Sequence, residues 1–337
     1  MATNRLKVVD ALEINFVDSC SRKEFKLNTS GEQAPGKTKG IGEKRLYISN
    51  TKDPSEYDTF FEFEKLEYFF FKKSDLIQYI KDARDEYLNP TQNYLGSIKE
   101  FYEQNYNLIL NLKDEYIKFH FSRTHDSQNR YYLVLVGSKG KNNPNRAAYS
   151  YLLDICLPRV TKFNFVKLQN ENNGKIFIYL KPNFVNSSKI EEFVLNERKK
   201  DTQDREKTRK LQSSYRFKLL DIMPSCVISQ VADDRILIAC HIKPFAKCDE
   251  AEEFDENNGI ILTPTYHYLF DIGFISFDEN ANLIVSDFLS KLNQKRLHIE
   301  TGQASQIKNT TKRQEYLKYH RNNIFQKVNV NSDILIK

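Results

Sequence analysis

Two of the six histidines in this 337-residue chain are spaced from other polar residues in a way that suits metal-dependent hydrolysis. His241 opens the run His241-Ile-Lys-Pro-Phe, and His267 precedes Asp271 by four residues. Residues four apart on a helix share one face, so His267 and Asp271 can grip the same ion. Imidazole is also a frequent general base near neutral pH. These residues could therefore supply a base and two metal ligands.

The elements around these residues are predicted to be two strands and a helix. Residues 226–229, Cys-Val-Ile-Ser, have the composition of a short strand, and residues 236–240 form a second one that ends on His241. After an acidic stretch that leads to Asn258, the apolar spacing of residues 263–271 predicts a helix bearing His267. A β-hairpin is expected over residues 273–286. The chain thus presents strand, strand and helix, with His, Asn and His in that order.

This order resembles the ββα-metal arrangement of HNH nucleases, and the resemblance covers about residues 212–286. One branch of that family reads roughly HIKPW, then D-x-N-N-G-L-L-L, then LFD-x-G-L-I-S-F. The corresponding blocks here begin at His241, Asp255 and Leu269, and a later Tyr319-His-Arg-Asn-Asn-Ile-Phe is similar to the closing YHR…F of the branch. Several separated blocks in the same order are more specific than any one of them.

The resemblance implies a role for each polar residue of the pattern. His241 would be the general base, Asn258 would brace the loop and orient that base, and Lys243 would clamp the phosphate. His267 and Asp271 would hold Mg²⁺, for which Mn²⁺ could substitute. Simpler readings stay open: a structural His241, an ordinary Asn-Gly turn at Asn258, a solvated Lys243, and an Asp271 that caps the following hairpin.

One position departs from the usual HNH pattern. Many of these nucleases place Asp or His immediately before the base as a further metal ligand, whereas this chain has Cys240. A thiol is a poor partner for Mg²⁺, so we expect water, the substrate phosphate or a carboxylate such as Asp234 to complete the coordination. A structural Zn²⁺ site is not favoured, because Cys226, Cys240 and Cys248 are irregularly spaced.

The first part of the chain predicts a separate α+β domain. Residues 131–136 and 175–180 have strand composition, and residues 74–88 and 95–109 carry apolar residues at helical spacing. Residues 196–211 are almost wholly charged and suit an exposed helix or a tether. We therefore expect an α+β DNA-recognition domain over residues 1–200 and an HNH nuclease domain with a basic C-terminal tail over residues 201–337.

The charge distribution supports a nucleic-acid partner. From Lys291 to the end the chain has 10 Lys or Arg and 3 Asp or Glu, a net charge of +7, and the whole chain carries only +6. Cations that displace condensed counterions from DNA add affinity that does not depend on sequence. A solvated surface helix would have the same composition. No apolar run suits a membrane span or a secretory signal, so a cytoplasmic protein with reduced cysteines is expected.

A second motif points to nucleotide binding but lacks its structural context. Residues 31–38 match the phosphate-loop pattern G-x-x-x-x-G-K-[ST] letter for letter. That loop needs a buried strand before it and a helix after it, so that backbone N–H groups converge on the phosphates. The preceding residues are polar, and two glycines follow where the helix would have to start. We therefore expect no nucleotide cofactor.

The function predicted from the sequence is that of a type II-like restriction endonuclease acting on double-stranded DNA. A modification-dependent or non-specific HNH DNase would use the same chemistry. A non-catalytic DNA-binding protein with a degenerate nuclease fold is the third reading, which the joint presence of His241, Asn258 and His267 disfavours. A double-strand break needs two cleavage events, so a homodimer on DNA is expected.

Overall fold

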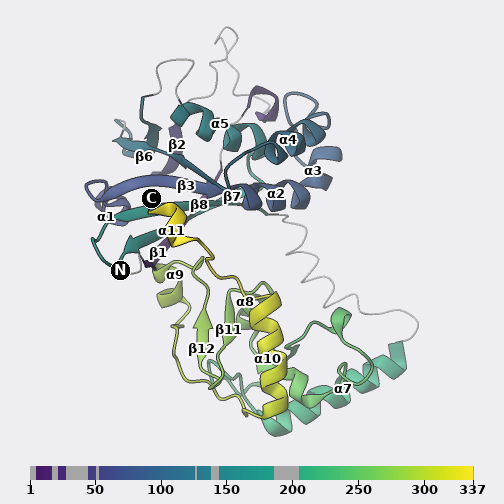
Figure 1. Ribbon diagram of the computed structural model, residues 1–337. Coiled ribbons are helices and arrows are strands. Elements are labelled where there is room, and N and C mark those ends of the chain that lie inside the picture. Colours follow the sequence, from purple (N-terminus) through teal and green to yellow (C-terminus); the bar gives the residue numbers. More distant parts are fainter. Residues whose placement is uncertain are drawn as a thin grey trace. The chain divides into compact units, whose positions relative to one another are not determined.

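The computed structural model (Figure 1) describes residues 5–16, 22–27, 45–50, 53–125, 127–137, 144–185 and 205–336. The chain forms two compact units, the first comprising residues 1–188 and 330–337 and the second residues 189–329. Both α-helices and β-sheets are present, as the predicted α+β class requires. The boundary predicted near residue 200 falls within residues 186–204, which lie outside the described part of the chain.

The first unit contains two β-sheets. The larger one is five-stranded in the order β1-β7-β8-β3-β4, with bounds Leu6–Asn15, Thr161–Asn170, Ile176–Phe184, Leu66–Lys72 and Tyr116–Phe119. Its strand pairs are antiparallel except for β3 with β8, which is parallel. The smaller sheet has the antiparallel order β2-β6-β5, with bounds Arg45–Asn50, Arg130–Leu135 and Phe121–His125. Strands β6 and β8 confirm the two strands predicted from composition.

Helices accompany these sheets and share an aromatic core with them. They are α1 (Ser55–Phe61), α2 (Lys73–Asp82), α3 (Arg84–Leu88), α4 (Phe101–Leu110) and α5 (Pro144–Ile155), with a short 3-10 helix at Lys23–Phe25. Phe69, at the centre of the core, contacts the rings of Phe61, Phe119, Phe121 and Phe165. The first unit therefore buries a core of its own, as a domain that folds around one core must.

Two predicted helices of this unit have different bounds in the structure. The helix expected over residues 74–88 is divided at Ala83 into α2 and α3. The helix expected over residues 95–109 begins only at Phe101. Its first residues bond elsewhere, since the Leu95 N–H donates to the Lys26 carbonyl at 2.7 Å and the Gly96 N–H to the Glu24 carbonyl at 3.3 Å.

The last residues of the chain belong to the first unit. Helix α11 (Ser332–Leu335) places Leu335 in a buried position, and its carbonyl accepts a hydrogen bond from the Tyr68 hydroxyl on β3. The Asn331 N–H donates to the Tyr116 hydroxyl on β4 at 2.8 Å. The C-terminus therefore packs on the five-stranded sheet, although nothing in the sequence pattern assigned these residues to the first unit.

The second unit contains the predicted ββα element, although with a different first strand. Strand β9 (Ile238–His241) pairs antiparallel with β10 (Gly259–Leu262), and α8 (Pro264–Asp271) follows. Residues 226–229, predicted as a strand, instead form a turn. The Gln230 N–H closes this turn on the Cys226 carbonyl at 2.9 Å, with Gln230 at φ 60°. The left-handed residue ends any extended run at that point.

The remaining elements surround this motif. They are α7 (Arg205–Ile222), β11 (Ile275–Phe277), β12 (Leu283–Val285), α9 (Lys291–Arg296), α10 (Thr311–Asn323) and 3-10 turns at Asp234–Ile236, Phe245–Lys247 and Glu256–Asn258. The pairing of β11 with β12 confirms the predicted hairpin. Gly273 precedes it with φ +75°, and a Cβ there would lie 2.1 Å from the Ile324 carbonyl oxygen. The glycine of the LFD-x-G block thus lets the chain after α10 pass close to the end of α8.

His320, in the closing YHR block, has a structural role. Its Nε2 donates to the Phe270 carbonyl at 3.0 Å, its Nδ1 lies 2.9 Å from the Ser276 hydroxyl, and its ring stacks on Phe270 at 3.7 Å. Because a carbonyl only accepts, the bond to Phe270 places the ring hydrogen on Nε2, and Nδ1 then accepts from Ser276. Burial lowers the pKa of His320 to about 4. The ring therefore joins α8, β11 and α10 in its neutral form.

This lowered pKa predicts acid sensitivity of the second unit. The unfolded imidazole binds a proton below about pH 6.5 and folded His320 only near pH 4, so stability is complete above pH 6.5 and falls toward pH 4. The loss should reach about 3 kcal/mol of unfolding free energy. Urea unfolding followed by circular dichroism at both pH values should show it, with a smaller loss in His320→Gln. An equal loss in both proteins would contradict this assignment.

Two stretches singled out in the sequence lie wholly or partly outside the described residues. They are residues 31–38 and residues 196–204 of the charged segment. Residues 205–211 of that segment belong to α7. In the part of the chain that the structure describes, no helix is long and apolar enough to cross a membrane.

Candidate metal centre and hydrolytic site

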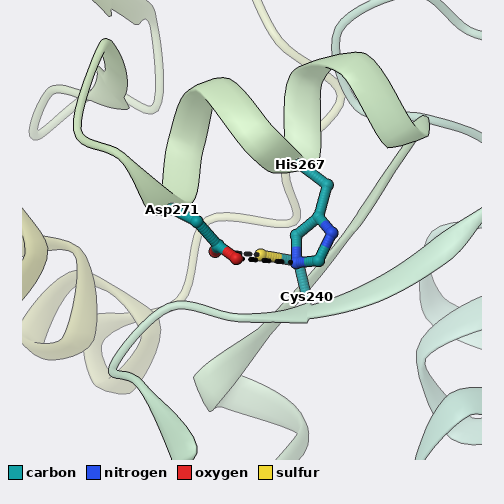
Figure 2. Close-up of side chains that lie close together, drawn as sticks. All are labelled: Cys240, His267 and Asp271. Carbon is teal, nitrogen blue, oxygen red and sulfur yellow. Dashed lines mark hydrogen bonds and ion pairs between the residues drawn. The ribbon is translucent and has the colours of Figure 1, made fainter. Parts of the chain in front are cut away.

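Three side chains with metal-binding atoms converge between β9 and α8 (Figure 2). The ligand atoms of Cys240, His267 and Asp271 all lie within 4.8 Å of one another. The Cys240 Sγ is 3.8 Å from Asp271 Oδ1, and the His267 Nε2 is 3.2 Å from Asp271 Oδ2. Cys240 and His267 are buried, whereas Asp271 is exposed. Among the described residues this group could hold a metal ion.

Local structure explains why these residues meet. Pro264 starts α8 at a position where its missing N–H costs nothing, and the helix then carries His267 and Asp271 on one face at i and i+4. Cys240 pairs with Ile260 in the middle of the β9–β10 ladder, so its side chain has a fixed direction. The sequence predicted the helical pair. It predicted water, substrate or a carboxylate such as Asp234 as the further ligand, and the structure places the Cys240 thiol beside the pair.

His241, next to Cys240, is held by an aromatic stack and one hydrogen bond. Its ring lies on the ring of Tyr215 from α7, with centroids 4.8 Å apart and an interplanar angle of 14°. Its Nε2 is 2.8 Å from the Glu253 carbonyl oxygen. Because a carbonyl only accepts, the neutral ring carries its hydrogen on Nε2, and Nδ1 is the nitrogen able to accept a proton.

Tyr215 was not singled out in the sequence, and a glycine makes room for it. The Tyr215 hydroxyl donates to the Asn258 carbonyl at 3.0 Å. A Cβ on Gly259 would lie 2.2 Å from the Tyr215 hydroxyl oxygen and 2.5 Å from a methyl of Leu219. Gly259 is therefore needed for the close approach of α7, which brings the Tyr215 ring onto His241. The only feature of the sequence that could have indicated this contact is Gly259, the glycine of the Asn-Asn-Gly block.

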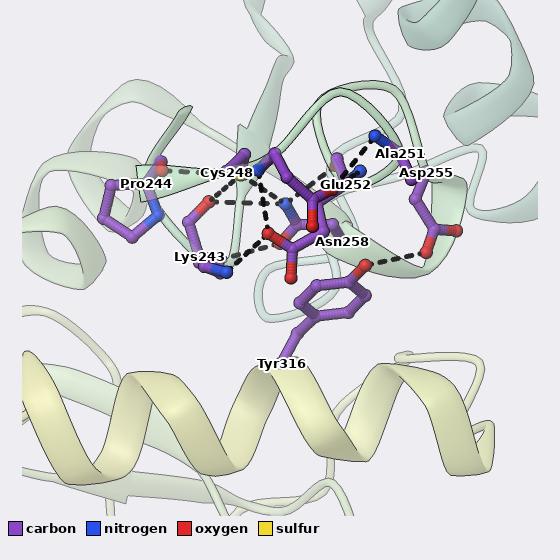
Figure 3. A network of polar contacts seen from close by, with 9 residues as sticks. Lys243, Pro244, Cys248, Ala251, Glu252, Asp255, Asn258 and Tyr316 are labelled. Carbon is purple, nitrogen blue, oxygen red and sulfur yellow. Dashed lines mark hydrogen bonds and ion pairs between the residues drawn. The ribbon is translucent and has the colours of Figure 1, made fainter. Parts of the chain in front are cut away.

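Asn258 is fully buried and braces the segment between β9 and β10 (Figure 3). Its Oδ1 accepts from the Lys243 N–H at 2.8 Å, and its Nδ2 lies within 3.4 Å of the Lys243 carbonyl, the Cys248 Sγ and the Glu252 carbonyl. Gly259 after it has φ −142°, so this Asn-Gly pair does not form a left-handed turn. The simple-turn reading of Asn258 was wrong.

Lys243 lies in an ion pair within the domain. Its Nζ pairs with the Glu252 carboxylate and lies 5.4 Å from the centre of the Tyr319 ring. The hydrogen bond that Lys243 donates to Glu252 raises the pKa of Lys243 and lowers the pKa of Glu252. Lys243 is therefore a paired cation. Lys247, four residues later, is exposed to solvent.

Part of the basic C-terminal tail serves as scaffold for this loop. Burial opposes ionisation of Asp255, but hydrogen bonds from Lys312, Asn257 and Tyr316 outweigh it and lower the pKa of Asp255 to about 2. Arg313 is buried and donates to the Glu256 carbonyl at 2.7 Å. Helix α10 is thus fastened to the loop that carries Asn258. These cations stabilise the domain, although the sequence had suggested that the tail contacts phosphate.

The three cysteines considered for a structural zinc do not come together. Cys240 lies with His267 and Asp271, the Cys248 Sγ accepts from Asn258, and the Cys226 Sγ accepts from the Ser229 N–H at 3.5 Å.

Residues 226–278 match the family model of HNH endonucleases. The matched segment is thus similar to an HNH endonuclease domain. It contains β9, β10 and α8 with Cys240, His241, Asn258, His267 and Asp271. The match supports a DNA-cleaving hydrolase that uses a divalent ion, and it agrees with the resemblance seen in the sequence. No curated protein matches the chain.

Proposed function

We propose that this protein is a restriction-type endonuclease whose second unit hydrolyses phosphodiester bonds of double-stranded DNA. The proposal is carried by the group of Cys240, His267 and Asp271, which could hold a metal ion, together with the oriented ring of His241, the residue that follows Cys240 inside the HNH match. A base and a cluster of metal ligands are the two groups that metal-assisted hydrolysis needs.

In this proposal His241 is the general base. It takes a proton from the attacking water through Nδ1, while Nε2 stays bonded to the Glu253 carbonyl. The water oxygen bonds to phosphorus, the bond from phosphorus to the leaving sugar oxygen breaks, and that oxygen takes a proton from solvent. Stacking on Tyr215 restricts ring rotation, so the accepting nitrogen keeps one direction.

The position of the substrate phosphate follows from strand geometry. Cys240 and His241 are consecutive on β9, so their side chains leave opposite faces of the strand. One phosphate can meet both only at the strand end, and β9 ends at His241. Asn258 holds the loop beyond this end in place, which makes it a positioning residue.

A divalent ion would be held by Cys240, His267 and Asp271, and when bound it supplies a Lewis acid for the charge that develops on phosphate. Mg²⁺, with Mn²⁺ as a substitute, is the ion that the sequence predicted. The Asp271 carboxylate suits both ions and the His267 imidazole suits Mn²⁺, but the thiol of Cys240 suits Mg²⁺ poorly.

The first unit is proposed to select the DNA site. It has its own core, and the HNH match lies wholly outside it. One centre attacks one phosphodiester, so we propose that two copies of the chain act on one duplex. Lys295, Arg296 and Lys318 are exposed on the second unit and can contact phosphates without disturbing the scaffold.

Digestion of one mapped DNA tests this proposal. With a divalent ion the full chain should yield fragments whose ends share one sequence, and EDTA should abolish cutting. Methylated and unmethylated copies of the DNA distinguish a restriction enzyme from a modification-dependent one. Cleavage that persists in EDTA would exclude the metal mechanism, and fragment ends without a common sequence would exclude site selection by the first unit.

A further inference from the structure

Cys240 differs from an ordinary buried cysteine, because its thiol faces polar groups. Its side chain is 1% exposed and belongs to the apolar core of the second unit, yet its Sγ faces the Asp271 carboxylate at 3.8 Å. The carboxylate in turn contacts the His267 Nε2 at 3.2 Å. Sulfur, nitrogen and oxygen donors from two elements therefore face a common point (Figure 2).

The separations between these donors are close to those around a small tetrahedral ion. With bonds of about 2.3 Å to sulfur and about 2.0–2.1 Å to nitrogen and oxygen, tetrahedral angles place S and O about 3.6 Å apart and N and O about 3.3 Å apart. In the structure the Cys240 Sγ is 3.8 Å from Asp271 Oδ1, and the His267 Nε2 is 3.2 Å from the other oxygen of that carboxylate, Oδ2. The three ligand atoms lie within 4.8 Å of one another, so an ion between them requires the side chains to turn one carboxylate oxygen toward both the sulfur and the nitrogen.

The donor types discriminate between ions more sharply than the distances do. Mg²⁺ demands oxygen ligands in octahedral geometry, whereas thiolate and imidazole suit Zn²⁺ and Co²⁺. Three protein ligands with one open position are also the usual arrangement of a catalytic zinc site. Asp271 is exposed, so the open position can face solvent and substrate.

We propose that this centre binds a borderline divalent ion such as Zn²⁺ or Co²⁺ through the Cys240 thiolate, in preference to Mg²⁺. The inference rests on the proposed function, which makes the cluster a metal centre, and it specifies the class of ion. This centre differs from the structural zinc site considered above, because Cys226 and Cys248 are not among its ligands.

Titration of the full-length protein with Co²⁺ provides the test, because bound Co²⁺ reports its ligands by absorption. The wild-type protein should bind one Co²⁺ per chain with an intense near-ultraviolet band from sulfur-to-cobalt charge transfer. Cys240→Ser should lose this band. Cys248→Ser, which removes another thiol of the same unit outside the cluster, should keep it. Bound Co²⁺ without the band, or a band unchanged in Cys240→Ser, would overturn the proposal.

A second variant keeps the test independent of folding defects and of activity. Cys240→Asp supplies an oxygen donor, so the ratio of Mg²⁺ to Cd²⁺ affinity should rise by at least about tenfold relative to the wild-type protein. An unchanged ratio would overturn the inference. If the band is present but no DNA is cut, the ion assignment stands and the proposed nuclease function fails. If DNA is cut in a metal-dependent way but the band is absent, the proposed nuclease function stands and the ion assignment fails.

Discussion

Replacing His241 by alanine is expected to slow DNA cleavage by at least about 10²–10⁴-fold, the range that a positioned general base contributes. Loss of the ring removes the Nδ1 that would accept the proton of water, but it leaves the Cys240, His267 and Asp271 donors in place. DNA affinity should hardly change, because phosphate contacts come from Lys and Arg and a neutral ring adds little to counterion release. Single-turnover cleavage and a filter-binding titration on the same duplex measure the two effects.

His298 provides the matched control for this experiment. It is an exposed histidine of the same unit with φ 55°, and asparagine tolerates that backbone conformation, so His298→Asn removes an imidazole without strain. This variant should cut at the wild-type rate. Thermal melting of His241→Ala is needed as well, because the ring stacks on Tyr215. A folded His241→Ala protein that cuts as fast as wild type would exclude His241 as the base.

Local spacing was sufficient to predict the parts of the site that lie on one element. His267 and Asp271 share a face of α8 because helix geometry alone sets the i to i+4 distance. His241 stands at the end of a strand for an equally local reason, the continuous apolar run of residues 236–240 before it. The β11–β12 hairpin followed from the same kind of pattern.

The partners that come from distant segments could not be predicted in this way. Tyr215 reaches His241 only because α7 packs against β10 at Gly259, and nothing in the sequence around Tyr215 records that packing. At position 240 the sequence indicated that the usual Asp or His ligand is missing, since it shows the residue type but not the Asp271 carboxylate that the Cys240 sulfur faces. In both cases the decisive information is a tertiary contact.

One error at the level of the fold has a similar origin. Residues 226–229 have strand composition, but the Val227 N–H donates to the Ile261 carbonyl from within a turn, so the apolar residues serve the core without extending the sheet. The basic residues after Lys291 suggested DNA contact, and one of them, Arg313, satisfies backbone carbonyls in the interior instead. Composition does not separate these outcomes, because burial decides them.

Replacing His267 by alanine should raise the concentration of metal needed for half-maximal cleavage by at least about tenfold, because even outer-shell partners of a metal site contribute about 10–100-fold to affinity. His267 is one of three donors in the cluster and is buried, so water replaces its nitrogen poorly. The rate at saturating metal should fall less than in His241→Ala, since the base remains in place. Cleavage rates over a metal titration separate the two effects.

The two histidine variants form a crossed comparison in which each serves as the control of the other. His241→Ala should bind Co²⁺ as wild type does and cut slowly, whereas His267→Ala should bind Co²⁺ weakly and recover part of its rate as metal is added. His267→Gln retains a polar side chain of similar volume and guards against loss of packing around α8. An unchanged metal titration in a folded His267→Ala protein would place the ion on other residues. It would also mean that the i to i+4 pair of His267 and Asp271 does not bind the metal.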